Sequence, residues 1–161
     1  MIKIDNSLIS AISEKAQKSD RKRMNYNFHK AAYDSLQRLI NAIEPYSYIQ
    51  PHKHENPDKR EIFFILKGRM AVVEFDDHGN ILDHIILDAE KGNFAVEIPE
   101  RTWHTIISLE KNSVAYEFKD GPYNADEDKN FATWAPKEGD SNSSAYIENL
   151  LENLQLKIQT F

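Results

Sequence analysis

The sequence contains no cysteine, and this absence excludes disulfide bonds, thiolate metal sites and cysteine nucleophiles. Long hydrophobic runs are also missing, since the apolar stretch from Ile62 to Leu66 is far shorter than a membrane-spanning helix. The first residues, MIKIDNSLIS, lack the extended apolar core of a signal peptide. We therefore expect a cytoplasmic protein that does not contact membranes.

Basic residues are fewer than acidic residues. The chain has 20 Lys and Arg against 26 Asp and Glu, a net charge of −6, whereas a protein that binds the nucleic acid backbone needs a basic surface. We therefore expect no nucleic acid partner. The bases concentrate between Lys15 and Arg38, which indicates a solvated face; the alternative is that some of them contact an anionic ligand.

Aromatic residues are plentiful enough for a packed interior. The 161 residues include eight Phe, seven Tyr and two Trp, which suits one domain with a sizeable core. We expect a single domain over residues 1–161. Its parts are a helical N-terminal region over 1–45, a β-barrel over 46–118, and an acidic loop with a C-terminal helix over 119–161.

Three segments have the spacing of amphipathic helices. The first covers residues 5–18, where Asp5, Asn6 or Ser7 can cap the N-terminus. The second covers about 30–43 and is ended by Pro45. The third covers 144–158, with an apolar side made of Tyr146, Ile147, Leu150, Leu151, Leu154 and Ile158.

The middle of the chain changes to a period of two, which is typical of short strands separated by turns. Lys67-Gly68-Arg69 predicts a short hairpin connection between two of these strands. A set of short strands of this kind indicates a sandwich or barrel. The predicted strands cover residues 46–54, 61–66, 70–75, 81–87, 94–98, 104–109 and 114–118.

Two histidines stand two residues apart on the first of these strands. His52 and His54 therefore face the same side, and Glu61 opens the next strand, so antiparallel pairing would place its carboxylate beside both imidazoles. His104 begins a later strand and supplies a third imidazole. Three imidazole nitrogens and one carboxylate suit one divalent transition metal, such as iron, manganese, nickel or zinc, and leave positions open for water or substrate.

These residues resemble the two motifs of the cupin superfamily. The resemblance implies a mainly β fold, the cupin double-stranded β-helix or jelly-roll barrel, with N-terminal helices and a C-terminal helix, and a metal held inside. Arg101 stands where the second motif has Gly, and we interpret it as a rim residue that contacts an anion. The positions that fit are His52, His54, Glu61 and Gly68 for the first motif, and Pro99 and His104 for the second.

A closer resemblance extends over most of the chain, to the WbuC-type cupin-fold metalloproteins associated with bacterial gene clusters for surface polysaccharide. It implies a cupin metalloprotein but no particular reaction, and cupins commonly form homodimers. The segments that carry it are Asn27-Phe28-His29, Tyr48 to His54, Ile98-Pro99, Trp103-His104-Thr105, Gly121-Pro122-Tyr123 and Phe131 to Gly139.

Four further side chains are candidates for the site. His29 is either an acid or base in the pocket or a histidine that bonds the backbone at a helix start. Glu117 is either a base inside the barrel or, as we favour, a solvent-facing residue. Tyr123 either offers a phenol at the barrel mouth or packs in its loop. Gln50 shares the face of the metal ligands, where it either binds a water molecule or packs at the strand start.

Two enzymatic hypotheses and one non-catalytic hypothesis follow. The first is an isomerase or epimerase of a sugar or sugar nucleotide, in which His29 or Glu117 moves a proton beside a polarised carbonyl and Arg101 binds a phosphate or carboxylate. The second is an Fe(II)-dependent dioxygenase. The third is a binding or sensing module in which the metal is structural or recruits a small-molecule ligand.

Overall fold

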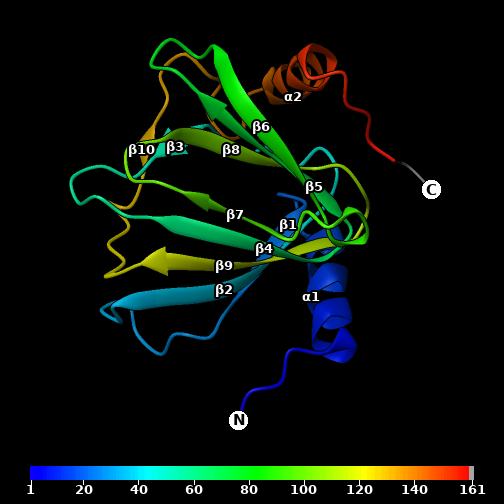
Figure 1. Cartoon of the computed structure of the whole chain (residues 1–161), viewed down its shortest axis with the longest axis vertical. Coiled ribbons are helices and arrows are strands. Elements are labelled where there is room, and N and C mark those ends of the chain that lie inside the picture. Colours follow the sequence, from blue (N-terminus) through cyan, green and yellow to red (C-terminus); the bar gives the residue numbers. More distant parts are fainter. Residues whose placement is uncertain (160–161) are drawn as a thin grey trace.

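The computed structural model describes residues 1–159, which form ten β-strands, two α-helices and one short 3-10 helix (Figure 1). The helices are α1 (Asn6–Lys18), η1 (Ala89–Lys91) and α2 (Ser143–Asn153). The strands are β1 (Arg23–Asn27), β2 (Leu36–Ile43), β3 (His52–Lys53), β4 (Glu61–Lys67), β5 (Arg69–Phe75), β6 (Ile81–Asp88), β7 (Ala95–Ile98), β8 (Trp103–Ser108), β9 (Ser113–Asp120) and β10 (Asn130–Phe131).

The strands form two antiparallel sheets that face each other (Figure 1). One sheet has the order β1-β2-β9-β4-β7, and the other has the order β10-β3-β8-β5-β6. Apolar side chains from both sheets, among them Phe63, Met70 and Ile106, fill part of the space between them. The predicted mainly β fold class is confirmed.

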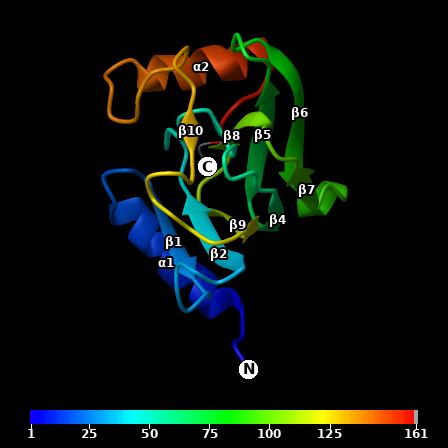
Figure 2. The ribbon, with the colours of Figure 1, turned by 90° about the vertical axis from the view of Figure 1, so that its left-hand side faces the viewer.

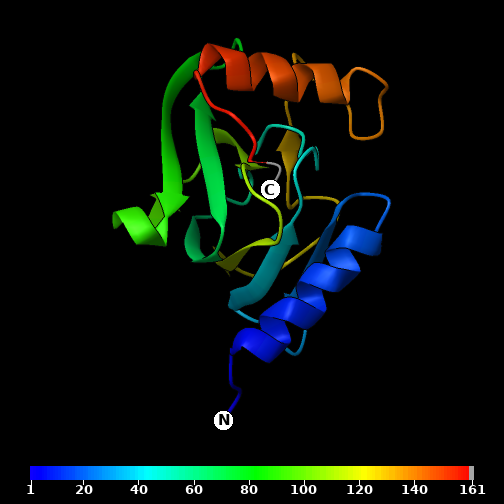
Figure 3. The ribbon, with the colours of Figure 1, turned by 90° about the vertical axis from the view of Figure 1, so that its right-hand side faces the viewer.

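The two α-helices cover opposite outer faces of this sandwich (Figures 2 and 3). Helix α1 packs Ile12 against Ile40 of the first sheet, and its start is the predicted one, since the Asp5 carboxylate caps it. Helix α2 packs Ile147 against Val73 of the second sheet. No helix among residues 1–159 is long and apolar enough to cross a membrane.

The helix predicted over residues 30–43 is wrong, because residues 36–43 form strand β2. This strand is buried on both faces: Leu39 and Ile43 line the cavity between the sheets, while Ile40 and Ala42 pack under α1. A strand covered on both faces has no polar alternation, and its apolar residues then fall at helical spacings. The β region begins at β1 and not at residue 46.

Two details of the predicted strands are also wrong. Lys67-Gly68-Arg69 does not connect a hairpin, because β4 belongs to the first sheet and β5 to the second. Gly68 makes this change of sheet with a φ of +70°, where a Cβ atom would lie 2.5 Å from Ser113 Oγ. The strand predicted over 46–54 is reduced to β3, because only its end pairs with neighbours.

Candidate metal centre

The four predicted metal ligands come together between the two sheets. His52 on β3 pairs in register with His104 on β8, and His54 follows β3 directly. Glu61 starts β4 on the opposite sheet, where β4 pairs with β7 and β9, so the predicted pairing of its strand with β3 is wrong. The sandwich nevertheless brings one donor atom of each residue within 4.8 Å of the others, and all four side chains are buried.

Each of the three histidines is held by a backbone carbonyl. Nδ1 of His52 donates to the Gln50 carbonyl at 3.0 Å, and Nδ1 of His104 donates to the Thr102 carbonyl at 2.8 Å. Nδ1 of His54 bonds the carbonyl of Asp128. Because a carbonyl only accepts, each Nδ1 carries the proton, and each Nε2 keeps a lone pair for a metal.

This arrangement gives the cluster an excess of acceptors. His54 Nε2 lies 2.9 Å from Glu61 Oε1, and His104 Nε2 lies 3.0 Å from Glu61 Oε2. In the tautomer set by the carbonyls, neither neutral imidazole has a proton to donate to the carboxylate. Acceptors this close in a buried site need a positive charge between them, either a proton on an imidazole or a metal ion, so the residues fit a divalent metal.

The protonation states suit the same role. Burial lowers the pKa of His52 well below its ordinary value, and the Lys129 ammonium lowers it further, so this imidazole is neutral. Burial alone would raise the pKa of Glu61, but the imidazoles of His104 and His54 outweigh burial and lower it. The cluster therefore presents a neutral imidazole at His52 and an ionised carboxylate at Glu61, the forms that bind a metal.

A buried network of ion pairs lies next to the cluster and holds the residues around it. Lys59 Nζ donates to Asp128 Oδ1 at 2.8 Å and to the Pro122 carbonyl at 2.7 Å. Lys119 Nζ donates to Asp128 Oδ2 at 2.6 Å and lies 3.7 Å from Glu61 Oε1. Since the Asp128 carbonyl also accepts from His54, this network fixes the loop that orients one metal ligand.

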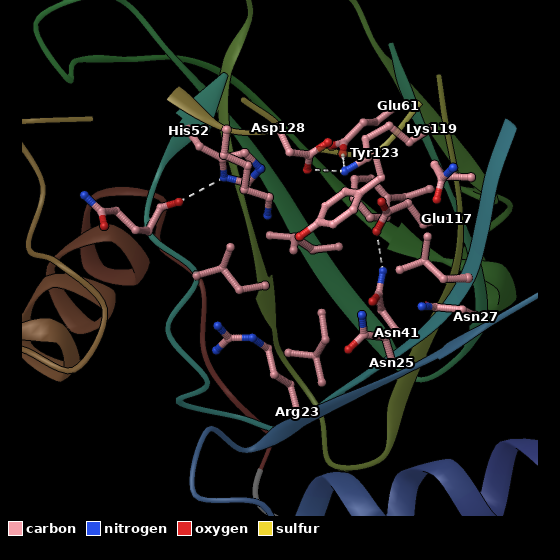
Figure 4. A pocket seen from close by; sticks show the side chains of 18 of the residues that line it. Arg23, Asn25, Asn27, Asn41, His52, Glu61, Glu117, Lys119, Tyr123 and Asp128 are labelled. Carbon is pink, nitrogen blue, oxygen red and sulfur yellow. Dashed lines mark hydrogen bonds and ion pairs between the residues drawn. The ribbon is translucent and has the colours of Figure 1, made fainter. Parts of the chain in front are cut away.

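The cluster opens into a cavity of about 460 Å³ between the sheets, a size suited to a small molecule. His29, Gln50, Glu117 and Tyr123 are among the residues that line it. In Figure 4, Glu117 and Asn41 meet on one wall, and Arg23 lies apart from the cluster at the far end. Arg23 is one of the N-terminal bases for which contact with an anionic ligand is the alternative to a solvated face, and here its partner is Glu138, 2.5 Å away.

The solvent-facing position favoured for Glu117 is wrong. Glu117 sits on β9 between β2 and β4 and is buried, because this face of β9 points between the sheets. Asn41 Nδ2 donates to Glu117 Oε2 at 2.5 Å. Burial raises the pKa of Glu117 to about 7, and the negative charge of Glu61 adds to the rise. The side chain can therefore take up or release a proton near neutral pH.

The remaining predicted residues have simpler contacts. Gln50 is buried and donates to the Ala132 carbonyl at 2.9 Å. His29 bonds the backbone of Arg38, but it precedes a strand and not a helix. Tyr123 is part-exposed at the cavity, with Lys119 Nζ 5.8 Å from the centre of its ring.

Arg101 does not line this cavity. Its Nη2 lies 2.9 Å from Asp58 Oδ2, and its Nε donates to the same carboxylate. The residue has a φ of +61°, a conformation that glycine adopts freely, which agrees with the Gly of the cupin motif at this position. The structure thus gives Arg101 a carboxylate partner outside the cavity.

Sequence reasoning missed several polar residues of the wall, namely Asn25, Asn27, Asn41, Lys119, Asp128 and Lys129. A recognisable signal existed for some of them. Asn25 and Asn27 alternate with apolar Met24 and exposed Tyr26 on β1, which is a strand pattern. Asp128 and Lys129 lie in a loop, where no periodicity reveals which side chains turn inward.

Solved structures with similar folds include a capsular polysaccharide assembling protein and a sugar isomerase. The capsular polysaccharide assembling protein CapF from Staphylococcus aureus superposes with a TM-score of 0.52 at 22% identity, over 66% of this chain and 28% of that chain. This chain therefore spans less than a third of CapF. L-ribose isomerase from Cellulomonas parahominis, solved with L-psicose, has a TM-score of 0.54 at 12% identity, over 69% of each chain. At these identities the likeness concerns the fold alone.

No curated protein matches the sequence. The family model described as a domain of unknown function, DUF6016, matches residues 4–87, just over half of the 161 residues. The architecture is a cupin-like sandwich with helices at both ends, and its interior holds a buried cluster of three histidines and one glutamate. The chain belongs to the DUF6016 family.

Proposed function

We propose that this protein is a metal-dependent enzyme that moves a proton on a sugar or sugar nucleotide, as an isomerase or epimerase. The observation that carries the proposal is Glu117, a buried carboxyl group on the wall of the cavity that holds the metal cluster, with a pKa raised to about 7. A carboxyl with this pKa can accept and return a proton at neutral pH.

The proposed cofactor is one divalent transition metal, such as iron, manganese, nickel or zinc, held by His52, His54, Glu61 and His104. When bound, it would polarise a carbonyl oxygen of the substrate and make the adjacent C–H more acidic. Glu117 then accepts that proton, and its bond from Asn41 fixes the direction of the carboxylate.

Two further groups on the cavity wall can exchange protons with a substrate. His29 is held by the backbone of Arg38, and Tyr123 lies at an exposed edge of the cavity. An epimerase that inverts a carbon needs a donor on the face opposite to its base, and these residues are the candidates for that donor. Gln50, with its amide held on Ala132, is a positioning residue for groups bound at the cluster.

The sugar substrate is supported by similarity and not by geometry. One solved neighbour is named an L-ribose isomerase and another a capsular polysaccharide assembling protein. The resemblance of the sequence to WbuC-type proteins points to the same setting, the synthesis of bacterial surface polysaccharide. A homodimer is proposed on the same resemblance.

A second candidate is an Fe(II)-dependent dioxygenase, which the cluster of three imidazoles and one carboxylate favours. It predicts oxygen uptake by the iron-loaded protein in the presence of substrate. A non-catalytic module predicts metal binding with no turnover by any metal-loaded form.

Elemental analysis of the purified protein tests the metal, and proton exchange tests the chemistry. We expect about one transition metal per chain in the wild type and little in His52→Ala or His104→Ala. Incubation of the loaded protein with aldoses and ketoses in D2O should label the carbon next to the carbonyl. Glu117→Gln should lower this exchange about 100-fold or more while it keeps the metal.

The exposed Glu97 supplies a matched control, since Glu97→Gln should leave both the metal and the exchange unchanged. Wild-type protein that takes up no metal from any supplemented medium refutes the proposal. Loaded protein that exchanges equally well with and without Glu117 refutes the assigned base.

A further inference from the structure

Lys129 lies beside the metal cluster on the segment that leads into β10. Asn130 turns outward, where its side chain accepts a bond from the backbone N–H of Glu55. Lys129 and Phe131, one residue to either side, both line the cavity, as alternation along an extended segment requires. Phe131 lies with its ring centre 6.2 Å from that of His52, so this segment forms the wall next to the ligands.

The other bases of the cavity wall all have acidic partners. Lys119 is paired with Asp128 at 2.6 Å. Arg21 and Arg23 share the carboxylate of Glu138 at 2.6 and 2.5 Å.

Lys129 differs from them. Within residues 1–159, its ammonium group makes no hydrogen bond and no ion pair, although the side chain is half-buried. A half-buried cation on a cavity wall with no acidic partner keeps its hydrogen-bond donors available, and such a group can bind an anionic ligand.

The charges of the side chains that line the cavity indicate which sign of charge a ligand should carry. Four basic and four acidic side chains line the cavity, so their charges sum to zero when Glu117 is ionised and to a positive value when it is protonated; they are Arg21, Arg23, Lys119 and Lys129 with Glu61, Glu117, Asp128 and Glu138. A divalent cation at the histidine cluster therefore leaves the cavity positive, and an anionic ligand restores the balance.

We infer that the Lys129 ammonium binds an anionic oxygen group, a carboxylate or a phosphate, of the small molecule that occupies the cavity. This inference rests on the proposed function and narrows its substrate to a sugar acid or a phosphorylated sugar. It also replaces Arg101 as the anion-binding residue, because Arg101 is paired with Asp58 outside the cavity.

The electrostatics agree with this position. Burial lowers the pKa of Lys129, while the carboxylates of Glu61 and Glu117 act in the opposite direction. In return, the Lys129 ammonium lowers the pKa values of His52 and Glu117. The charge of Lys129 therefore acts on both His52, a metal ligand, and Glu117, the proposed base. A ligand bound between these two residues would be close enough to interact with the same charge.

Calorimetric titration of the metal-loaded protein with glucose 6-phosphate, glucuronate and glucose tests the inference. The wild type should bind at least one of the two anions more tightly than glucose, and the preferred anion tells phosphate from carboxylate. Lys129→Met should raise the Kd of that anion tenfold or more. Lys129→Arg and the control Lys91→Met, an exposed lysine on η1, should stay within threefold of the wild type.

Two outcomes overturn the inference: a Kd that Lys129→Met changes by less than twofold, or no binding of either anion to the loaded wild type. Metal content and thermal midpoint are measured on the same samples. Lys129→Met should keep one metal per chain and should not lower the midpoint, because it removes an unpaired charge. If the wild type takes up no metal, the proposed function fails, and titration of that metal-free protein still tests Lys129, whose contacts come from the chain alone.

Discussion

The pKa of Glu117 makes the stability of the metal-free protein depend on pH in a defined window. The carboxyl has an ordinary pKa of 4.5, raised to about 7 in the folded chain by burial and by the charge of Glu61. Between these values the folded protein holds a proton that the unfolded chain has released. The contribution of Glu117 to the free energy of unfolding therefore falls as the pH rises from about 4.5 to about 7, and it changes no further above that.

The size of this fall follows from the difference between the two pKa values. At about 1.4 kcal/mol per pKa unit, ionised Glu117 costs the folded state on the order of 3 kcal/mol at pH 8. Glu117→Gln has no charge to bury, and its side-chain oxygen can still accept from Asn41. We expect this variant to be about 3 kcal/mol more stable than the wild type at pH 8 and within about 1 kcal/mol of it at pH 4.

Urea unfolding of the chelator-treated protein at pH 4, 6 and 8 measures this difference, with Glu97→Gln as the control that should follow the wild type. Loading with a divalent metal should reduce the difference, since a cation at Glu61 offsets the charge that helps to raise the pKa of Glu117. Identical pH profiles for wild type and Glu117→Gln would falsify the assignment of Glu117 as a buried proton carrier.

Two further substitutions test the supports of the site. Lys59→Met breaks a buried ion pair and should lower the thermal midpoint by about 5–10 °C and weaken metal binding about tenfold. Competition with a chelator measures the metal affinity, with Lys91→Met as the control. Equal affinities of the two variants would show that the network does not orient the ligands. Gly68→Ala places a methyl group 2.9 Å from a backbone carbon of β9 at a φ of +70° and should cost about 2 kcal/mol or more in urea unfolding. Gly92→Ala, at a similar φ with nothing within 4 Å, should cost only about 1 kcal/mol, and equal losses would contradict the close contact at Gly68.

The metal ligands were predictable because their information is local. The spacing of His52 and His54 places both imidazoles on one side whatever the strand pairs with, and Glu61 and His104 stand at the starts of strands that the sequence marks clearly. The pairing of these strands was not predictable, because it depends on which sheet each strand joins. Glu61 reaches the histidines from across the sandwich, which no pattern in its own strand indicates.

The errors have a common physical origin in contacts between distant parts of the chain. β2 lost its alternation because α1 covers its outer face, and Glu117 is buried because β9 lies between β2 and β4. The bond from Asn41 to Glu117 spans 76 residues. Local propensity predicts a helix or strand whose buried face follows from its own sequence pattern. It fails where packing against a second layer changes which faces of a strand are covered.

The groups around the cavity form one coupled set of charges. Without a cation, burial and the carboxylate of Glu61 raise the pKa of Glu117 to about 7. A cation at the cluster would offset the contribution of Glu61, and Glu117 would then be a stronger acid and an available base. The ammonium of Lys129 acts in the same direction. An anionic substrate on Lys129 cancels its effect and raises the proton affinity of Glu117 at the moment when the carboxylate has a C–H proton to accept. Metal and substrate thus tune the same carboxyl group in opposite directions, which suits a residue that must take a proton and give it back.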